Sequence, residues 1–148
     1  MTQLTLARPE DLERLDALVA ACQAEAAMPR DDAMRRAALA PLLDGTPHGA
    51  AYLIGPRRAP IGHVVVGFGW SLDHGGLTGS IDSLYIRPGV RGRGIGTEVL
   101  RTLPRALAGA GLKALHLAAE TRDGQARRLF ARAGFRALDG VQPMTRQL

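Results

Sequence analysis

Glycine and arginine alternate along residues 91–96, in the order Arg-Gly-Arg-Gly-Ile-Gly, and this spacing is suited to holding an anion. Glycines let the backbone approach a phosphate closely, and Arg91 and Arg93 can donate charge-assisted hydrogen bonds to it. An apolar, β-prone run at 81–86 precedes this glycine loop (residues 91–96), and a helical pattern of apolar residues follows it. Because a helix start carries free N–H groups and positive potential, the segment predicts a site for a phosphorylated cofactor.

Three kinds of phosphate-binding loop compete for this segment. The nucleotide-triphosphate loop requires Gly-x-x-x-x-Gly-Lys-Ser/Thr, and Lys113, the only lysine of the chain, lies far from the glycines. The dinucleotide motif Gly-x-Gly-x-x-Gly has a different spacing, and Glu120 is only a loose match to its ribose-binding acid. The third pattern, Arg/Gln-x-x-Gly-x-Gly/Ala, matches from Arg91 to Gly96 and is followed by Thr97.

This third match resembles the loop with which the GNAT superfamily of acyl-CoA-dependent N-acetyltransferases wraps the pyrophosphate of acetyl-CoA. A second block, Asp-Gly-Gln-Ala-Arg-Arg-Leu-Phe-Ala-Arg-Ala-Gly-Phe at 123–135, is similar to the family's Asn-x-x-Ala-x-x-Leu-Tyr-x-x-x-Gly-Phe helix. The resemblance covers most of the chain and is weakest over 27–50. It implies that an acetyl group passes from acetyl-CoA, the co-substrate, to a primary amine of a small molecule or peptide, by direct attack in a ternary complex.

The resemblance also assigns site residues. In such a fold the strands at 81–86 and 112–119 run parallel and splay apart, and the pantetheine arm pairs with free backbone groups of Leu84 and Ile86. The positions expected to contact the cofactor are Leu84, Tyr85, Ile86, Arg91, Gly92, Arg93, Gly94, Ile95, Gly96, Thr97, Asp123, Ala126 and Phe130.

Asp82 is the first candidate for the general base. It lies in an otherwise apolar strand beside the expected acyl site, where a buried carboxylate needs a reason. The alternative is a structural role, in which Asp82 pairs with an arginine or binds a neighbouring loop. Glu120 is the reserve base, and a backbone N–H of Tyr85 or Ile86 is expected to polarise the thioester carbonyl.

Two positions depart from the family pattern. Phe130 stands where the family usually has a tyrosine that protonates the leaving thiolate, and phenylalanine cannot donate a proton. Because a thiol has a pKa of roughly 8.5, the thiolate is a tolerable leaving group, and water or Tyr85 could supply the proton. Asp123 replaces an asparagine and could cap the following helix instead of contacting the cofactor. These departures leave a non-catalytic CoA-binding regulatory module as the alternative function.

The acceptor amine is left open by the sequence. Its contacts are expected from 26–49 and 71–79, and aminoglycosides, polyamines, amino acids and protein N-termini all fit the motifs. Four acids could face a cationic amine or simply be solvated: Asp31, Asp32, Asp73 and Asp82.

Hydrophobic periodicity predicts a mixed α/β chain. Strands are expected at 2–7, 50–54, 61–70, 79–86, 112–119, 135–138 and 144–148. Helices are expected from Pro9 to the break at Met28-Pro29, and at 31–45, 95–108 and 124–133. The order β-α-α-β-β-β-α-β-α-β-β is the one that the resembling family shows, so we expect a single acetyltransferase-like domain over 1–148.

Composition narrows the remaining possibilities. The chain has 148 residues, 46% hydrophobic and 22% charged, which is typical of a globular domain. Its net charge of +5 comes from scattered arginines, and with 4% aromatics we expect no nucleic-acid partner. No apolar run reaches the roughly 20 residues of a membrane span, Cys22 is the only cysteine, and the histidines lack metal-ligand spacing. We therefore expect a cytoplasmic enzyme without metal or membrane partner, and the resemblance makes a homodimer the expected assembly.

Overall fold

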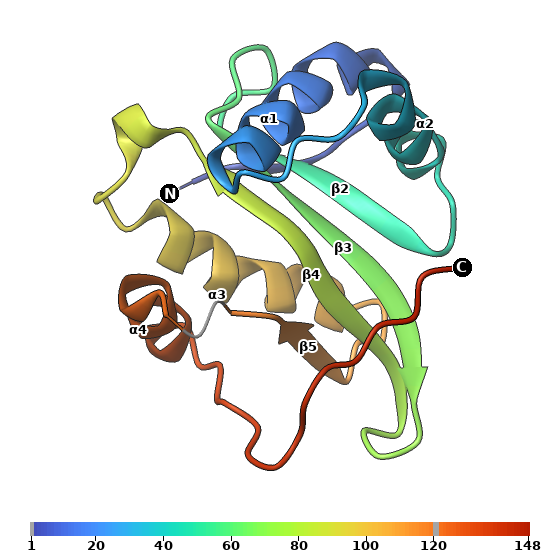
Figure 1. Ribbon diagram of the computed structural model, residues 1–148, viewed down its shortest axis with the longest axis vertical. Coiled ribbons are helices and arrows are strands. Elements are labelled where there is room, and N and C mark those ends of the chain that lie inside the picture. The colour runs from blue at the N-terminus through green and yellow to red at the C-terminus, as the bar shows by residue number, and fades with distance from the viewer. Residues whose placement is uncertain (1, 120–121) are drawn as a thin grey trace.

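The computed structural model describes residues 2–119 and 122–148, which form one mixed sheet with helices on both faces (Figure 1). The described strands β1 to β5 lie in chain order; the first three pairs are antiparallel, and β4 and β5 are parallel. The elements are β1 (Leu4–Leu6), η1 (Pro9–Asp11), α1 (Leu12–Glu25), α2 (Asp32–Leu43), β2 (Gly49–Ile54), β3 (Gly62–Ser71), β4 (Gly76–Ile86), η2 (Pro88–Val90), α3 (Ile95–Ala108), β5 (Ala114–Leu117) and α4 (Gly124–Arg132). The predicted α/β fold class is confirmed.

Helices α1 and α2 cover one face of the sheet because each carries an apolar stripe. Asp31 begins α2 as predicted, since its Oδ2 accepts a hydrogen bond from the N–H of Met34 at 3.2 Å. The buried residues of this layer are Leu15, Leu18 and Val19 of α1, Leu39 and Leu43 of α2, and Leu53, Val65 and Tyr85 of the sheet.

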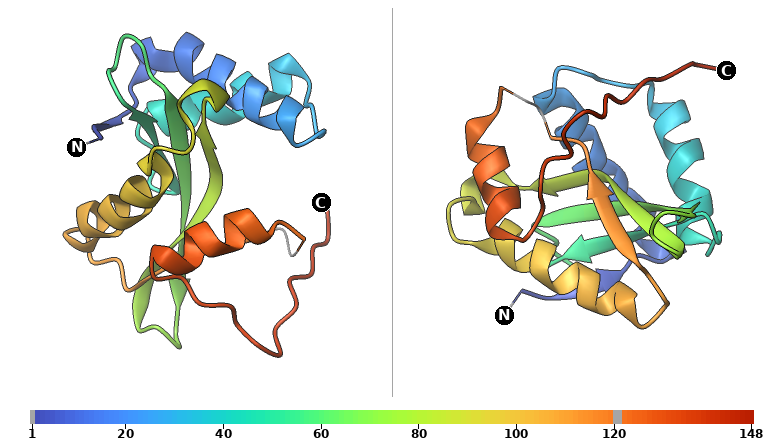
Figure 2. Two further views of the ribbon diagram at one scale, coloured as in Figure 1. Left: turned by 90° about the vertical axis from the view of Figure 1, so that its left-hand side faces the viewer. Right: turned by 90° about the horizontal axis from the view of Figure 1, so that it is seen from below.

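Helix α3 covers the opposite face, and α4 packs beside it (Figure 2). Helix α3 begins at Ile95 and ends at Ala108, in agreement with the predicted bounds. Side chains alternate along β3, so Val65 faces the α1 layer while its neighbours face α3. The buried residues of this second layer are Ile54, Val64 and Val66 of the sheet and Val99, Leu103 and Leu107 of α3.

Strand β4 extends beyond the end of its parallel partner β5. Pairing with β5 ends at Ile81 and Leu117, whereas pairing with β3 continues to Ile86. Residues 82–86 therefore have a strand on one side only among the described residues, which is the expected gap. The N–H of Arg87 donates to the carbonyl of Ile61 in the segment leading into β3, at 2.8 Å. By alternation, the N–H and C=O groups of even-numbered β4 residues near this end point into the gap.

The two closing strands predicted at 135–138 and 144–148 are wrong, because the chain after α4 is irregular (Figure 2). Most apolar side chains of this segment are exposed, including Leu138, Met144 and Leu148, so no buried face holds it in a sheet. Strand β5 consequently lies at the edge of the described sheet.

The loop expected at 71–79 is also shorter than predicted. Strands β3 and β4 form a long hairpin that closes where Ser71 pairs with Gly76, so most of the expected loop belongs to the sheet. Within the described residues, no helix combines the length and the apolar character needed to cross a membrane.

Candidate active site

The glycine loop joins β4 to α3 through left-handed backbone. Gly92 and Gly94 have φ angles of 78° and 80°, which L-residues rarely adopt, and Gly94 is the N-cap of α3. A Cβ at either position would meet nothing within 4 Å, so space is open beside the backbone. The N–H groups of the first turn of α3 have no intrahelical acceptor. A glycine-rich backbone, an open flank and a helix start therefore fit a pyrophosphate.

Gly96, unlike Gly92 and Gly94, is important for helix packing and not for left-handed backbone. A Cβ at this position would lie 3.4 Å from Cδ2 of Leu129, closer than most such contacts. Gly96 therefore lets α4 pack closely against the first turn of α3.

The two arginines of the loop differ in their contacts. Arg91 turns back toward β4: its Nε donates to the carbonyl of Ile86 at 2.7 Å, and its Nη2 binds Oε2 of Glu25 at 2.8 Å. Its guanidinium carbon also lies 5.5 Å from the ring centroid of Tyr85, a cation–π distance. Arg93 has no ion-pair partner among the residues that the structure describes. It is thus the loop arginine that is free to meet a phosphate.

The gap beside β4 exposes particular backbone groups. Alternation directs the N–H groups of Leu84 and Ile86 into the gap and the N–H of Tyr85 toward β3. Of the two N–H groups expected to polarise the thioester carbonyl, only that of Ile86 therefore points into the gap, because that of Tyr85 points toward β3. The carbonyl of Ile86 is already held by Arg91, which leaves that of Leu84 open.

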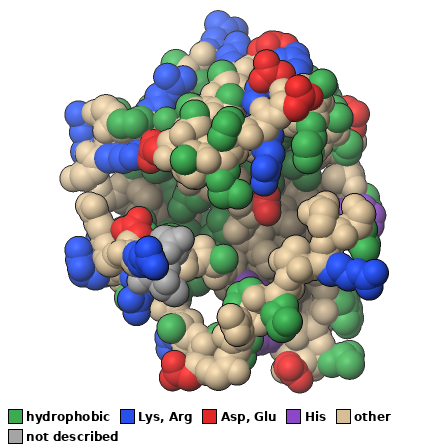
Figure 3. Space-filling view, viewed as in Figure 1, with side chains coloured by type: hydrophobic (Ala, Val, Ile, Leu, Met, Phe, Trp, Pro, Cys, Tyr) green, Lys and Arg blue, Asp and Glu red, His purple; other side chains and the backbone are tan. Residues whose placement is uncertain are grey.

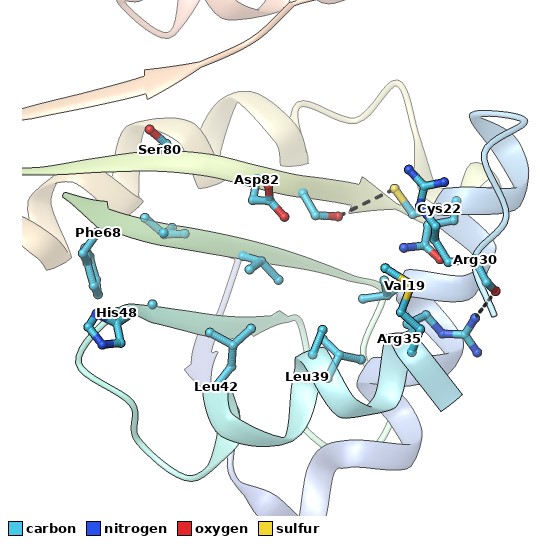
Figure 4. A pocket seen from close by; sticks show the side chains of 18 of the residues that line it. Val19, Cys22, Arg30, Arg35, Leu39, Leu42, His48, Phe68, Ser80 and Asp82 are labelled. Atoms are coloured by element: carbon cyan, nitrogen blue, oxygen red, sulfur yellow. Dashed lines mark hydrogen bonds between the residues drawn. The ribbon is translucent and has the colours of Figure 1, made fainter. Parts of the chain in front are cut away.

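A groove lies on the other side of β4, between the sheet and helices α1 and α2 (Figure 4), and we call it the α2 groove. Its volume is about 870 Å³, and the corresponding face of the molecule is hollowed (Figure 3). Its apolar lining includes Val19, Leu39, Leu42, Val65 and Phe68, and its polar lining includes Thr78, Ser80, Asp82 and Ser83.

A β-bulge places two consecutive polar residues in this groove. Ser83 lies opposite Val65, but Ile81 lies opposite the next residue, Val66, so Asp82 is an extra residue in β4. Regular alternation would send Asp82 and Ser83 to opposite faces, yet both line the α2 groove. Figure 4 shows Asp82 in this lining. Asp82 forms no ion pair or hydrogen bond with any described residue, so the arginine pairing considered for it is not observed.

Residues 12–135 match the acetyltransferase (GNAT) family. The chain belongs to the GNAT family of acetyltransferases. The predicted enzyme class is therefore confirmed, and acetyl-CoA is the co-substrate of that class. Comparison with curated proteins gives no match.

Solved structures share the GNAT fold of this chain. An integron cassette protein from the mobile metagenome of Cole Harbour Salt Marsh is 27% identical, with a TM-score of 0.85 over 99% of this chain and 90% of the other. A candidate acetyltransferase from Arthrobacter sp. FB24 is 26% identical, with a TM-score of 0.81 over 99% and 96%. The aminoglycoside N-acetyltransferase AAC(6')-Iy, solved with a CoA-linked bisubstrate analogue, is 13% identical, with a TM-score of 0.83 over 100% and 99%.

Helix α4 carries the departures from the GNAT pattern. Asp123 caps it, because its Oδ1 accepts from the N–H of Ala126 at 3.0 Å, as the alternative expectation had it. Phe130 packs edge-on against Phe135, with ring centroids 6.4 Å apart. Glu120, the reserve base, lies outside the described residues.

A buried histidine, which the sequence analysis did not single out, lies next to Ser83 of the groove lining. His63 is fully buried, and its Nε2 lies 2.7 Å from the hydroxyl of Ser83. Burial lowers the pKa of His63 to about 4, so the imidazole is neutral near pH 7. Ser83 pairs in regular register with Val65 and therefore lies on the same face of the sheet as His63. The bulge at the preceding residue, which depends on pairing with β3, has no local signal in the sequence.

Cys22 and Tyr85 flank the same cluster. Burial raises the pKa of the Cys22 thiol, and its Sγ lies 3.8 Å from the Ser83 hydroxyl, so a protonated thiol is expected at neutral pH. This agrees with a structural role for Cys22. Tyr85 is 8% exposed and stacks on His63 at 6.0 Å, so its ring belongs to the core of the α1 layer.

Proposed function

We propose that the chain is one acetyltransferase domain over residues 1–148 that transfers the acetyl group of acetyl-CoA directly to a primary amine. The observation that supports this most is that one segment of β4 borders both the gap expected to take the cofactor and the α2 groove. Residues 82–86 of β4 border the gap on their edge and, through Asp82 and Ser83, the α2 groove on their face. Cofactor and acceptor can therefore meet at one strand without a covalent enzyme intermediate.

The chain's own groups would hold acetyl-CoA as follows. The backbone of Leu84 and Ile86 pairs with the pantetheine arm in the gap, and the first-turn N–H groups of α3 bind the pyrophosphate. Arg93 adds a charge-assisted contact from the loop. Ala126 and Phe130, which lie one turn apart on the partly buried face of α4, are the proposed contacts from that helix, and Asp123 contributes by capping it.

In the proposed reaction, acetyl-CoA supplies an activated thioester carbonyl. Asp82 orients the acceptor ammonium and removes its proton, since it is a carboxylate without a cationic partner among the described residues. The N–H of Ile86 stabilises negative charge on the carbonyl oxygen. As the amine nitrogen bonds to the carbonyl carbon, the bond to sulfur breaks. Phe130 cannot donate and the Tyr85 ring is buried, so solvent water protonates the thiolate.

A CoA-binding module without catalysis is the second candidate, and two observations favour it. Phe130 lacks the hydroxyl expected of a proton donor, and Arg91 faces Glu25 rather than the glycine loop. Calorimetry with acetyl-CoA, CoA and NAD, followed by steady-state thiol release with a panel of amines, separates the two functions. Acetyl-CoA binding with amine-dependent thiol release supports the enzyme. Binding without release for any amine supports the module, and absence of CoA binding contradicts both.

A further inference from the structure

We infer that the acceptor amine carries a single cationic nitrogen on an apolar body and is not a polycation. This inference rests on the proposed function, because it takes the α2 groove as the acceptor site. It separates this chain from the polyamine and aminoglycoside acceptors that its sequence motifs leave open.

The carboxylates available to an acceptor are fewer than the sequence suggests. Asp31 is used as the cap of α2, and Asp32 binds Nη2 of Arg35 at 2.8 Å. Asp73 lies in the turn of the β3–β4 hairpin and is not part of the groove lining. Among the described residues that line the groove, Asp82 is the one carboxylate, so a second ammonium has no acidic partner there.

One of the two arginines that line the groove opposes a second positive charge. Arg30 and Arg35 both line it. Arg35 is neutralised, because its Nε binds Oδ1 of Asp16 at 2.7 Å in addition to its bond with Asp32. Arg30 has no ion-pair partner among the described residues. Since like charges repel, the unpaired guanidinium of Arg30, an exposed residue of the groove lining, disfavours acceptors that carry several ammonium groups.

The walls of the groove favour an apolar body. Branched and aromatic side chains form its sides, and two methionines, Met28 and Met34, extend the apolar surface with 56% and 63% exposure. Methionine adapts to varied apolar shapes. Each methylene of the acceptor that becomes buried against these walls is expected to strengthen binding about fourfold.

The test compares 3-methylbutylamine and 2-phenylethylamine with spermidine and kanamycin as acceptors, by thiol release at saturating acetyl-CoA. The kcat/KM of the two monoamines is expected to exceed that of either polycation at least tenfold. Replacing Arg30 by Glu should raise kcat/KM for spermidine several-fold more than it raises that for 2-phenylethylamine. Arg58→Glu, which makes the same charge change in the β2–β3 turn, should change neither value. A higher kcat/KM for a polycation overturns the inference.

A binding measurement keeps this inference distinct from the proposed catalysis. The same four amines are titrated calorimetrically into protein saturated with CoA, and the two monoamines should bind at least tenfold more tightly than spermidine. That order of affinities without thiol release would support the inference and refute the proposed catalysis. Spermidine binding as tightly as the monoamines, or no binding of either monoamine, would overturn the inference even if some other amine is acetylated.

Discussion

Arg91 of the glycine loop is joined to Glu25 at the last residue of α1, with Nη2 2.8 Å from Oε2. Through this pair, the helix that helps to form the α2 groove is connected to the loop expected to hold the cofactor. Arg91 also occupies the Ile86 carbonyl, which borders the gap. Acetyl-CoA that pairs with that carbonyl must therefore displace Arg91.

Replacing Glu25 by Gln should tighten acetyl-CoA binding about twofold to fivefold. The exposed ion pair between Glu25 and Arg91 contributes at most about 1 kcal/mol to keeping Arg91 turned away from the loop. The variant lacks this contribution. Calorimetry measures the effect. Glu10→Gln, which weakens the comparable ion pair of Glu10 with Arg57, serves as the control and should leave the affinity unchanged. Weaker binding in Glu25→Gln would mean that the pair positions Arg91 for the cofactor.

Gly94 should tolerate no side chain without loss of cofactor binding. An alanine there must adopt a φ of 80°, which costs about 1–2 kcal/mol, although its Cβ has open space. We expect Gly94→Ala to lower stability by that amount and acetyl-CoA affinity at least tenfold, as urea unfolding and calorimetry would show. Gly109→Ala is the matched control, because Gly109 has open space and an ordinary φ of −62°. Unchanged affinity in Gly94→Ala would remove the loop backbone from the site.

The sequence predicted the glycine loop and α3 well, because both depend on local signals. Glycines, an N-terminal turn and apolar residues at helical spacing all lie within some 20 residues of each other. The groove could not be predicted in the same way. Alternation alone would place Ser83 on the opposite face from Asp82, and the bulge that brings them together depends on pairing with β3, far earlier in the chain. The contact between Arg91 and Glu25 is likewise non-local.

The wrong predictions have a common physical origin. Residues 135–138 and 144–148 have a weak β pattern, but a strand is stable only when a face is buried, and most of these side chains are exposed. The hairpin of β3 and β4 shows the opposite error. Glycine, aspartate and histidine suggested a long loop at 71–79, while ladder pairing with β3 overrode these local preferences.

Asp82→Asn should lower kcat/KM for the best amine about 100-fold or more at neutral pH, because the amide cannot accept the amine's proton. Asp73→Asn, in the hairpin turn, is the control and should behave as the parent protein. Since Asp82 has no partner among the described residues, unfolding free energies of parent and variant should agree within about 0.5 kcal/mol. Unchanged kinetics would exclude Asp82 as the base.

Phe130→Tyr should raise kcat, by up to about tenfold, by restoring a hydroxyl that can protonate the thiolate. The increase should be largest where the phenol is protonated, below its ordinary pKa of about 10. Phe135→Tyr is the matched control, because it adds the same hydroxyl to the ring that packs edge-on against Phe130. This control should leave kcat unchanged. An unchanged kcat and pH profile in Phe130→Tyr would show that the missing hydroxyl does not limit the rate.

His63 should make the protein sensitive to mildly acidic pH. Burial lowers its pKa from 6.5 to about 4. Between these two pH values His63 is therefore protonated in the unfolded chain and neutral in the native state. The resulting contribution is fully present above pH 6.5 and is lost as the pH falls toward 4, amounting to about 2 kcal/mol by pH 5.

Urea unfolding between pH 7.5 and 5 isolates this effect, because the carboxylates of the folded and unfolded chain titrate below this window. Hydrogen bonds from Arg35, for example, hold the pKa of Asp16 below its usual range. His63→Gln retains a partner for the Ser83 hydroxyl but has no group that titrates in this window. The free energy of unfolding of the parent protein should therefore fall through the window while that of the variant stays nearly level. Parallel curves would mean that the pKa of His63 does not differ between the folded and the unfolded chain.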